Sequence, residues 1–517
     1  MSLFTNPEIV RNARIQLRPK RMISAAALCV AISVAIGYAY AQSADGLAGV
    51  NGNGFLHIIL IIQAVVLVIG GGIACLHAIQ REKDQNTFDF QRLTRLSPLE
   101  LTLGKLFGPP LMVLFVFLCF VPAAIVGAVA ARSSWTIILA VYVLLILGAV
   151  VYNAFALTIS LFLRRGAVTW AILFFIVVVA YGSSGNWYTP YLAFGSISPF
   201  AASDLARIGS WSMASTTMQV GKQTYTIPNG FHDLFFGVSV HHALVLLIFY
   251  TTILAWLIPA VGRNIKRDPT AYELYTPAQA LGFLCYLNFI LFAFFRWKFS
   301  LEQIGFSRNL TPLQSQSALF GINILLFFIF GLILLRNRSR MRRRLRSIET
   351  APVALESIWP APYIFLGAIL VGAAMILVIQ WKRDPTLEWS LTVAIFRVIF
   401  FAVWLSRDLL FLQWMNLRRG RHPLPLGVLY LLVYYVCAGL LVGALHLTQN
   451  PFTAIFLPTP LWELNTALWT THPAEWLVAL MGQAAIALIF VFLQRQQIEE
   501  LQPRPVETRA TSSVTAA

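Results

Sequence analysis

The sequence predicts an all-α, polytopic membrane protein with about twelve transmembrane helices in two six-helix halves. Apolar residues make up 58% of its 517 residues and charged residues 11%, whereas soluble domains carry roughly 25% charged residues. The mean hydropathy is +0.72. Long apolar runs recur along the chain, and basic residues gather between alternate runs. This composition excludes a soluble enzyme, a disulfide scaffold and a disordered regulator.

Twelve apolar runs approach the length of about 20 residues that a helix needs to cross a bilayer. Each run is continuously apolar, whereas the strands of a membrane barrel alternate polar and apolar residues, so helices are predicted. The runs cover residues 22–41, 55–79, 107–131, 135–163, 167–182, 235–262, 278–295, 317–335, 361–380, 390–412, 424–447 and 476–494.

Basic residues orient these helices, because Lys and Arg are retained on the cytoplasmic side of a membrane. With the N-terminus in the cytoplasm, the inner connections hold 28 Lys and Arg residues and the outer connections hold 8. Two more, Arg397 and Arg407, lie within a run. We therefore expect both termini in the cytoplasm, and the net charge of +17 then requires no nucleic-acid partner.

The first 41 residues allow two interpretations. A basic start, an apolar stretch and Ala39-Tyr40-Ala41 together have the form of a cleavable signal peptide. Asn6-Pro7-Glu8 instead has the form of a helix start, with an N-cap, a proline in the first turn and an acid near the helix dipole. We favour the second interpretation, an interfacial helix that leads into a retained span.

The sequence carries no P-loop and no metal-binding motif. Gly104-Lys105 is followed by leucine rather than by the serine or threonine of a P-loop. His241 and His242 are adjacent, so on a helix they cannot share a metal as residues four apart would. The five cysteines, all within apolar runs and without CxxC spacing, indicate neither a disulfide framework nor a zinc site: Cys29, Cys75, Cys119, Cys285 and Cys437.

The connection 81–100 has the most distinctive pattern in the chain. Ser97, Pro98 and Glu100 predict a capping box that starts a new helix. The segment before that helix mixes acids and bases with three apolar residues, Phe88, Phe90 and Leu93. Physical reasoning alone leaves two alternatives open, a solvated loop helix or a small docking surface.

Residues 81–105, REKDQNTFDFQRLTRLSPLELTLGK, resemble the permease subunits of the ABC transporter type-2 export family. In that family the second span is followed by a pattern like REREQGTLELLLLTPLSPLEILLGK. The opening Asn6-Pro7 with its basic helix and the segment Ser198-Pro199-Phe200 are also similar to the family. The resemblance covers about residues 1–267. It implies that this loop is a coupling helix that docks on a separate, dimeric ABC ATPase subunit.

The resemblance also suggests which residues of the loop face the ATPase. Asn86 stands where the family has glycine, and Arg95 where it has proline, and both departures bear on the local turn. The contact candidates implied by the resemblance are Glu82, Asp84, Thr87, Phe88, Asp89 and Leu96.

Polar residues inside spans are costly in hydrocarbon and mark a pathway or a partner. Arg397 lies about two turns from the outer edge of its run and is our intramembrane candidate for a functional residue. Arg407 and Asp408 lie near the inner end of the same run, where we expect them to snorkel to the interface. Interhelical hydrogen bonds are expected for Gln63, Asn153, Asn288, Asn323 and Gln483.

The spacing of the runs suggests an internal repeat. With an offset of about 252 residues, the second, third and fourth runs align with the eighth, ninth and tenth, and the basic loop 80–106 aligns with 336–360. Because each half would contain an even number of spans, six, the two halves would be parallel repeats. We expect a permease half over 1–267, a second six-span half over 268–494 as a degenerate repeat of the first, and a disordered cytoplasmic tail over 495–517.

The leading functional interpretation is the transmembrane permease subunit of an ATP-driven exporter in the cytoplasmic (inner) membrane. The chain itself would catalyse no covalent reaction and bind no cofactor, and the partner subunit would use the ATP. Its partners would be the ATPase, the lipid bilayer, and a second copy or another permease. An ion-coupled secondary transporter is the first alternative. A lipid-linked transferase is the second, although Asp233, Glu463 and His472 do not cluster in the sequence.

Overall fold

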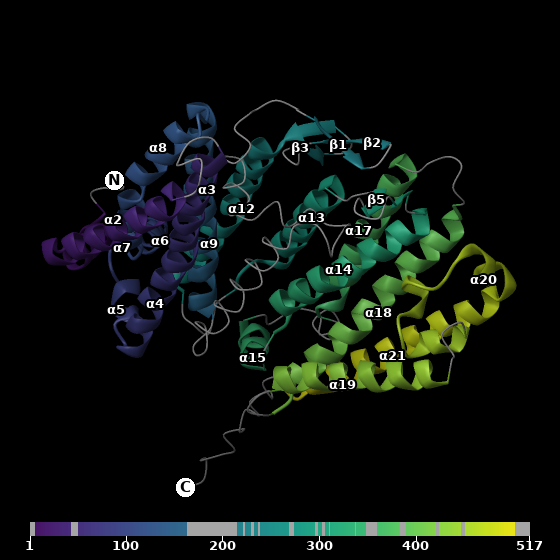
Figure 1. The fold of residues 1–517 in the computed structure, drawn as a ribbon. Helices are drawn as coiled ribbons and strands as arrows, with labels where there is room; N and C mark the ends of the chain where they lie inside the picture. Colours follow the sequence, from purple (N-terminus) through teal and green to yellow (C-terminus); the bar gives the residue numbers. More distant parts are fainter. Residues whose placement is uncertain are drawn as a thin grey trace, which may run out of the picture. The chain divides into compact units, whose positions relative to one another are not determined.

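The computed structural model describes residues 6–42, 50–162, 215–220, 223–228, 232–235, 238–267, 273–294, 298–301, 306–309, 311–336, 338–347, 359–382, 389–419, 423–445 and 450–501. The chain divides into two compact units. Unit 1 comprises Met1–Leu274 with Ala293–Arg296, and unit 2 comprises Tyr275–Phe292 with Trp297–Ala517. The division after Leu274 lies close to the boundary expected after residue 267 (Figure 1).

Unit 1 contains eleven described helical segments and two antiparallel hairpins. Its elements are α1 (Pro7–Gln16), α2 (Pro19–Ala41), α3 (Val50–Val65), the π-helical turn η2 (Val66–Gly70), α4 (Gly71–Asp84), α5 (Phe88–Arg92), α6 (Pro98–Phe107), α7 (Leu111–Cys119), α8 (Val121–Ala130), α9 (Trp135–Phe162), β1 (Ser215–Val220), β2 (Gln223–Pro228), β3 (His232–Phe235), β4 (Val238–His241) and α12 (His242–Ile265).

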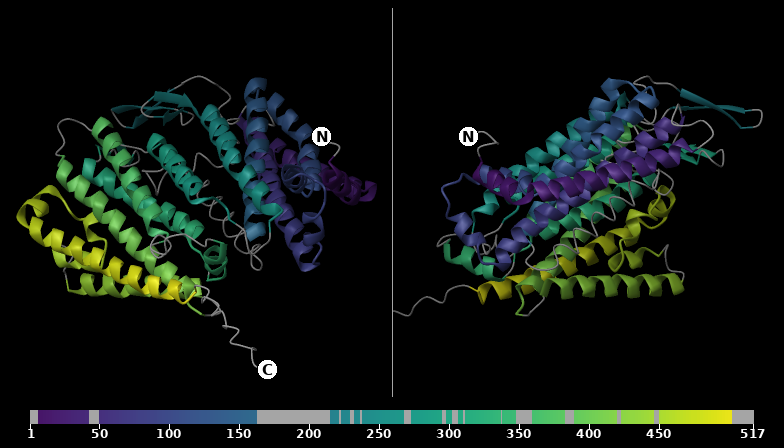
Figure 2. Two further views of the ribbon diagram at one scale, coloured as in Figure 1. Left: turned by 180° about the vertical axis from the view of Figure 1, so that it is seen from behind. Right: turned by 60° about the vertical axis from the view of Figure 1, so that its left-hand side comes forward.

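Unit 2 contains one described hairpin among helices. Its elements are α13 (Pro277–Phe294), β5 (Lys298–Leu301), β6 (Phe306–Asn309), α14 (Pro312–Leu334), α15 (Arg338–Ser347), α17 (Ala361–Lys382), α18 (Leu391–Leu417), α19 (Pro423–Ala444), the 3₁₀ turns η6 (Pro451–Ile455) and η7 (Thr459–Leu461), α20 (Thr466–Thr471) and α21 (Pro473–Glu499). Figure 2 shows the long helices of this unit from two further sides.

Nine helices in the described part of the chain are long and apolar enough to cross a membrane, as in a multi-pass membrane protein. They account for nine of the twelve predicted runs. Of the other three, 278–295 forms the shorter apolar helix α13, and 390–412 forms the 27-residue helix α18, which contains three charged side chains. The run 167–182 lies outside the described residues. Twelve spans therefore remain a prediction.

Local chemistry explains where the helices differ from the predicted runs. Pro122, in the first turn of α8, separates α7 from α8 within the run 107–131, because proline interrupts helix hydrogen bonding. The run 55–79 is one long helix with the π-helical turn η2 in its middle. The run 235–262 begins later than expected, because its first residues belong to the hairpin β3–β4. The sequence did not predict the three hairpins.

The core of unit 1 forms where α4 packs against α9 and the adjoining turn η2 packs against α7 and α9. Gly71 permits this packing, because a Cβ there would lie 2.7 Å from Oδ1 of Asn153. One apolar cluster surrounds this crossing, with Leu76, Phe117 and Tyr152 among its members. A second cluster lies at the α5 end of α4 and joins Ile79, Phe88, Leu101, Leu157 and Val261.

The core of unit 2 forms around α18, which packs against α14, α17, α19 and α21. Figure 1 shows α18 running alongside α21. Phe401 on α18 contacts the rings of Phe320 and Phe327 on α14 at centroid distances of 4.7 and 5.6 Å. Most of α18 is buried, so this helix is surrounded by protein on nearly all sides.

Candidate functional site

The turn between α4 and α5 has a defined geometry. Asn86 adopts φ 54°, in the left-handed region. The Asn86 N–H donates to the carbonyl of Lys83 (3.2 Å) and the Thr87 N–H to that of Glu82 (2.9 Å), which together form a Schellman motif. Glycine and asparagine are the residues that most readily take this conformation. Asn86 therefore suits this turn, as a glycine there would.

The capping box predicted at the start of α6 is confirmed. The Ser97 hydroxyl accepts from the Glu100 N–H (3.2 Å), and the Glu100 carboxylate accepts from the Ser97 N–H (2.9 Å). The bond from the Ser97 N–H to the carboxylate, followed by the nearby Ser97 hydroxyl, holds the pKa of Glu100 below its usual value. The predicted start of α1 is also confirmed, because the Asn6 side chain accepts from the Glu8 N–H.

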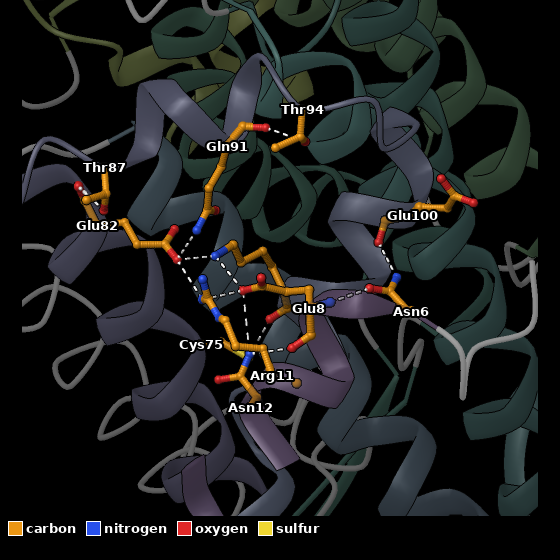
Figure 3. A network of polar contacts seen from close by, with 12 residues as sticks. Asn6, Glu8, Arg11, Asn12, Cys75, Glu82, Thr87, Gln91, Thr94 and Glu100 are labelled. Carbon is orange, nitrogen blue, oxygen red and sulfur yellow. Dashed lines mark hydrogen bonds and ion pairs between the residues drawn. The ribbon is translucent and has the colours of Figure 1, made fainter. Parts of the chain in front are cut away.

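A buried ion cluster joins α1, α4 and α6 behind the turn (Figure 3). The Lys105 ammonium is fully buried and contacts two carboxylates, Glu8 at 2.8 Å and Glu82 more closely. Arg11 lies 2.8 Å from Glu8 and 3.3 Å from Glu82. The Gln91 amide donates to Glu82 at 2.7 Å. Two cations and two carboxylates balance, so the cluster avoids the cost of a buried unpaired charge.

Further contacts attach α1 to α6 and to the start of α7. The Asn6 amide donates to the carbonyl of Glu100 at 2.7 Å. Near the other end of α1, Gln16 accepts from the backbone N–H of Met112 at 3.2 Å. Gly104 lies between, and a Cβ there would meet Cβ of Glu8 at 2.8 Å. The absence of a side chain at position 104 therefore allows the two helices to approach.

The outer face of α5 combines charge with exposed apolar side chains. Phe90 is 74% exposed and Leu93 is 83% exposed. Next to them in the sequence are Asp89 and Arg92, which form an ion pair at 2.7 Å. Large exposed apolar residues outside the spanning segments commonly mark an interaction surface. We call Asp89, Phe90 and Leu93 the α5 face.

The structure divides the six contact candidates into two groups. Asp84, Thr87 and Asp89 are exposed, and Leu96 is half-buried. Glu82 and Phe88 are buried, so in this structure their side chains are not presented at the surface of the loop. Glu82 is held by Lys105, and Phe88 packs in the core cluster.

Sequence analysis missed the residues that organise this site. Phe90 and Leu93 were noted only as apolar residues within the loop, and Lys105 only as part of a motif. A usable signal existed for Lys105, because a lone lysine inside the apolar segment LTLGKLFG needs a counter-charge. No local signal identifies Glu8 as that counter-charge, since it lies 97 residues away.

Arg397 is fully buried in unit 2, and neutral groups hold it. Its guanidinium donates to the carbonyls of Pro460 (2.9 Å), Leu313 (3.1 Å) and Leu461, and to the side chains of Gln316 (3.1 Å) and Ser317 (2.5 Å). All its donors are therefore used, and they anchor the turn η7 to α14 and α18. The geometry assigns Arg397 a structural role and leaves no donor free for a ligand.

We expected Arg407 and Asp408 to snorkel to the interface. Their side chains do not do so. Arg407 is 3% exposed and contacts Asp408 at 2.6 Å. It also donates to Gln483 (2.8 Å) and to the Tyr435 hydroxyl (2.5 Å), which in turn donates to Asp408. Gln483 donates to the carbonyls of Ala454 and Ile455, as expected for an interhelical polar residue. The pair is thus buried among α18, α19 and α21.

Within the described residues, no group of three or more His, Cys, Asp and Glu side chains could hold a metal ion. No family model matches the chain, and no curated protein and no solved structure matches it either.

Proposed function

We propose that the chain is the transmembrane permease subunit of an ATP-driven exporter, and that the α5 face is where a separate ATPase subunit docks. The observation that carries the proposal is the α5 face itself. It presents two large exposed apolar side chains and a carboxylate, on a short helix outside the candidate spans. An aromatic or aliphatic anchor beside charge is the composition of a protein-binding hot spot.

The ion cluster would transmit movement of the α5 face to the membrane helices. Lys105 and Glu82 connect α6 to α4, and Glu8 extends the connection to α1. A displacement of α5 by the partner would therefore move α1, α4 and α6 together, because separating buried opposite charges is costly. ATP binding and hydrolysis would occur on the partner subunit.

The chain would lie in the cytoplasmic (inner) membrane. The distribution of Lys and Arg supports a cytoplasmic location for the α5 face and for both termini. Unit 2 would supply the second half of the pathway if it is a degenerate repeat of unit 1. Its described helices occur in the order that the offset of about 252 residues requires, with α14, α17 and α18 at the positions of α3–α4, α7–α8 and α9.

The test is recovery of the ATPase with the full chain, purified gently from native membranes. The chain alone should hydrolyse no ATP, and the complex should do so. Phe90→Ala with Leu93→Ala should reduce recovery of a P-loop ATPase at least about tenfold, because hot-spot truncations commonly cost more than 1 kcal/mol each.

Trp135→Ala is the matched control, because Trp135 is 58% exposed and begins α9, at the opposite end from Leu157 and Leu161, which pack beside α5. It should leave recovery unchanged. Equal recovery with the double variant, or ATP hydrolysis by the chain alone, would contradict the proposal.

The Arg407–Asp408 pair favours ion-coupled secondary transport as a second candidate function, because intramembrane carboxylates are the usual coupling groups. Such a transporter would collapse an imposed proton gradient in proteoliposomes without ATP, as read by an internal pH dye. Asp408→Asn would abolish the collapse. A gradient that persists with the unmodified chain would argue against this candidate.

A further inference from the structure

The helix α15 differs from every other described helix in its charge. Residues 336–346 contain seven arginines, and residues 311–347 contain no Asp or Glu. Within α15, Met341 is fully buried and Leu345, four residues later, is partly buried. These two residues form its only apolar stripe, so the arginines occupy the remaining circumference of the helix.

The start of α15 is fixed to the end of α18 by uncharged groups. The Gln413 amide accepts from the backbone N–H of Arg336 (2.9 Å) and donates to the Arg336 carbonyl (3.0 Å). Arg338 donates to the carbonyl of Leu417 at 3.2 Å. The Arg336 guanidinium lies 3.8 Å from the ring of Trp359, whose indole N–H donates to Leu334. The helix is therefore held in place at the end of α14.

Positive charge accumulates at this end of unit 2. Arg418 and Arg419, at the end of α18, are both exposed, as is Arg342 on α15. Burial lowers the pKa of Arg338, the charges of Arg419 and Arg342 lower it further, and Glu500 is the acid that opposes them. Gln413 fixes the start of α15 through backbone groups of Arg336, and the exposed Arg342, Arg418 and Arg419 present their charge at the surface.

We propose that α15 binds the phosphate groups of anionic phospholipids at the membrane surface. Two candidate spans flank it, α14 ending at Leu334 and α17 beginning at Ala361. Clusters of four to eight basic residues beside a span attract anionic lipids, at about 1 kcal/mol per residue. Guanidinium groups bind phosphate in a bidentate manner. This inference needs only a multi-pass membrane protein and does not rest on the proposed transport function.

An anionic lipid is a better partner for α15 than an acidic protein surface, because α15 follows the spanning helix α14 so closely in the sequence. Only Leu335, Arg336 and residue 337 separate α14 from α15, so the arginines begin within one helical turn of a spanning helix. Trp359 is positioned beside them, and tryptophan is enriched at membrane interfaces. The α5 face, by contrast, offers apolar side chains suited to a protein.

The experiment measures binding of dioleoyl phosphatidylglycerol to the detergent-purified full chain by native mass spectrometry, with dioleoyl phosphatidylcholine as the zwitterionic comparison. The test variant combines Arg342→Gln, Arg343→Gln, Arg344→Gln and Arg346→Gln, which leaves the contacts of Arg336 and Arg338 intact. The first phosphatidylglycerol should bind at least about tenfold more weakly, with phosphatidylcholine binding unchanged. The single variant Arg342→Gln should weaken binding about fivefold, which covers the case in which the fourfold variant does not fold.

Two controls separate charge from position. Lysine at the same four positions keeps the charge and should bind phosphatidylglycerol within about threefold of the unmodified chain. Lys382→Gln removes a basic residue at the far end of α17 and should change nothing. Wild-type phosphatidylglycerol affinity in the glutamine variants would overturn the proposal. So would unchanged lipid binding together with loss of a co-purifying protein, because α15 would then be a protein docking surface.

Discussion

The connections after α4 and after α14 align in the sequence at an offset of about 252 residues but differ in what their charges do. Residues 81–105 contain five basic and four acidic side chains. One acid and one base, Glu82 and Lys105, are buried in the fold as an ion pair. The second connection contains seven arginines, and an uncharged amide, Gln413, fixes its helix. Charges that hold the fold together are unavailable to a partner, whereas charges outside the packing remain available for one.

The largest effect is expected from Lys105→Met, which leaves Glu8 and Glu82 buried with only Arg11 to balance them. Removing one partner of a buried ion pair costs about 3–5 kcal/mol. Thermal unfolding in detergent should show the loss. Lys83→Met is the control, because Lys83 is half-buried and donates to the carbonyls of Ser160 and Leu161, so its loss should cost less.

A double variant sharpens this prediction. Lys105→Met combined with Glu82→Gln should be less destabilised than the sum of the single variants, because residues of one network couple. Strict additivity would show that the ion cluster is not a unit.

Gln413→Leu is expected to have the next largest effect. It leaves the backbone N–H and carbonyl of Arg336 without their partner in a buried setting, at about 1–3 kcal/mol for each group. Unfolding temperature should fall, and phosphatidylglycerol binding should weaken because α15 loses its position. Gln380→Leu, at an exposed position of α17, should be nearly neutral. A stable Gln413 variant would show that α15 is positioned in another way.

Gly104→Ala should destabilise unit 1 by about 1–3 kcal/mol, because the added Cβ would lie 2.8 Å from Cβ of Glu8 and force α1 away from α6. Gly321→Ala in α14 is the matched control, since nothing lies within 4 Å of a Cβ there. Alanine should raise helix stability at that position by up to about 1 kcal/mol. The same measurement, thermal unfolding, compares both variants. Equal effects at both positions would contradict the close approach of α1.

The smallest effect concerns the capping box. Because the folded-state pKa of Glu100 is lowered, its contribution to stability is present above the pKa of the unfolded chain. That contribution disappears as the pH falls through the lower, folded-state value. Glu100→Gln should therefore be slightly less stable than the unmodified chain at neutral pH and equal to it in acid. Ser97→Ala keeps the backbone N–H that donates to the Glu100 carboxylate, so it should leave most of this pH-dependent difference in place. A difference that persists in acid would assign it to another group.

Most of the helices could be predicted from the sequence, because a spanning helix depends on the composition of its own residues. The helix caps were predictable for the same reason, since a cap joins residues two or three positions apart. They are formed by Ser97 with Glu100 and by Asn6 with Glu8. The interruption at Pro122 was also encoded locally, although it was not predicted. The hairpins were not predicted, because short two-stranded pairings leave a weak pattern in the sequence.

The sequence by itself determined that this is a helical membrane protein, where its helices cap, and which loop carries a coupling-like pattern. Only the tertiary structure decided which charges face inward. Glu82 and Asp89 are both acids of one short segment, yet Glu82 meets Lys105 and Arg11 of other helices, whereas Asp89 remains exposed. Likewise, Arg397 is satisfied by carbonyls of a turn more than 60 residues later. Pairing across such separations depends on how helices pack, and packing has no local signature.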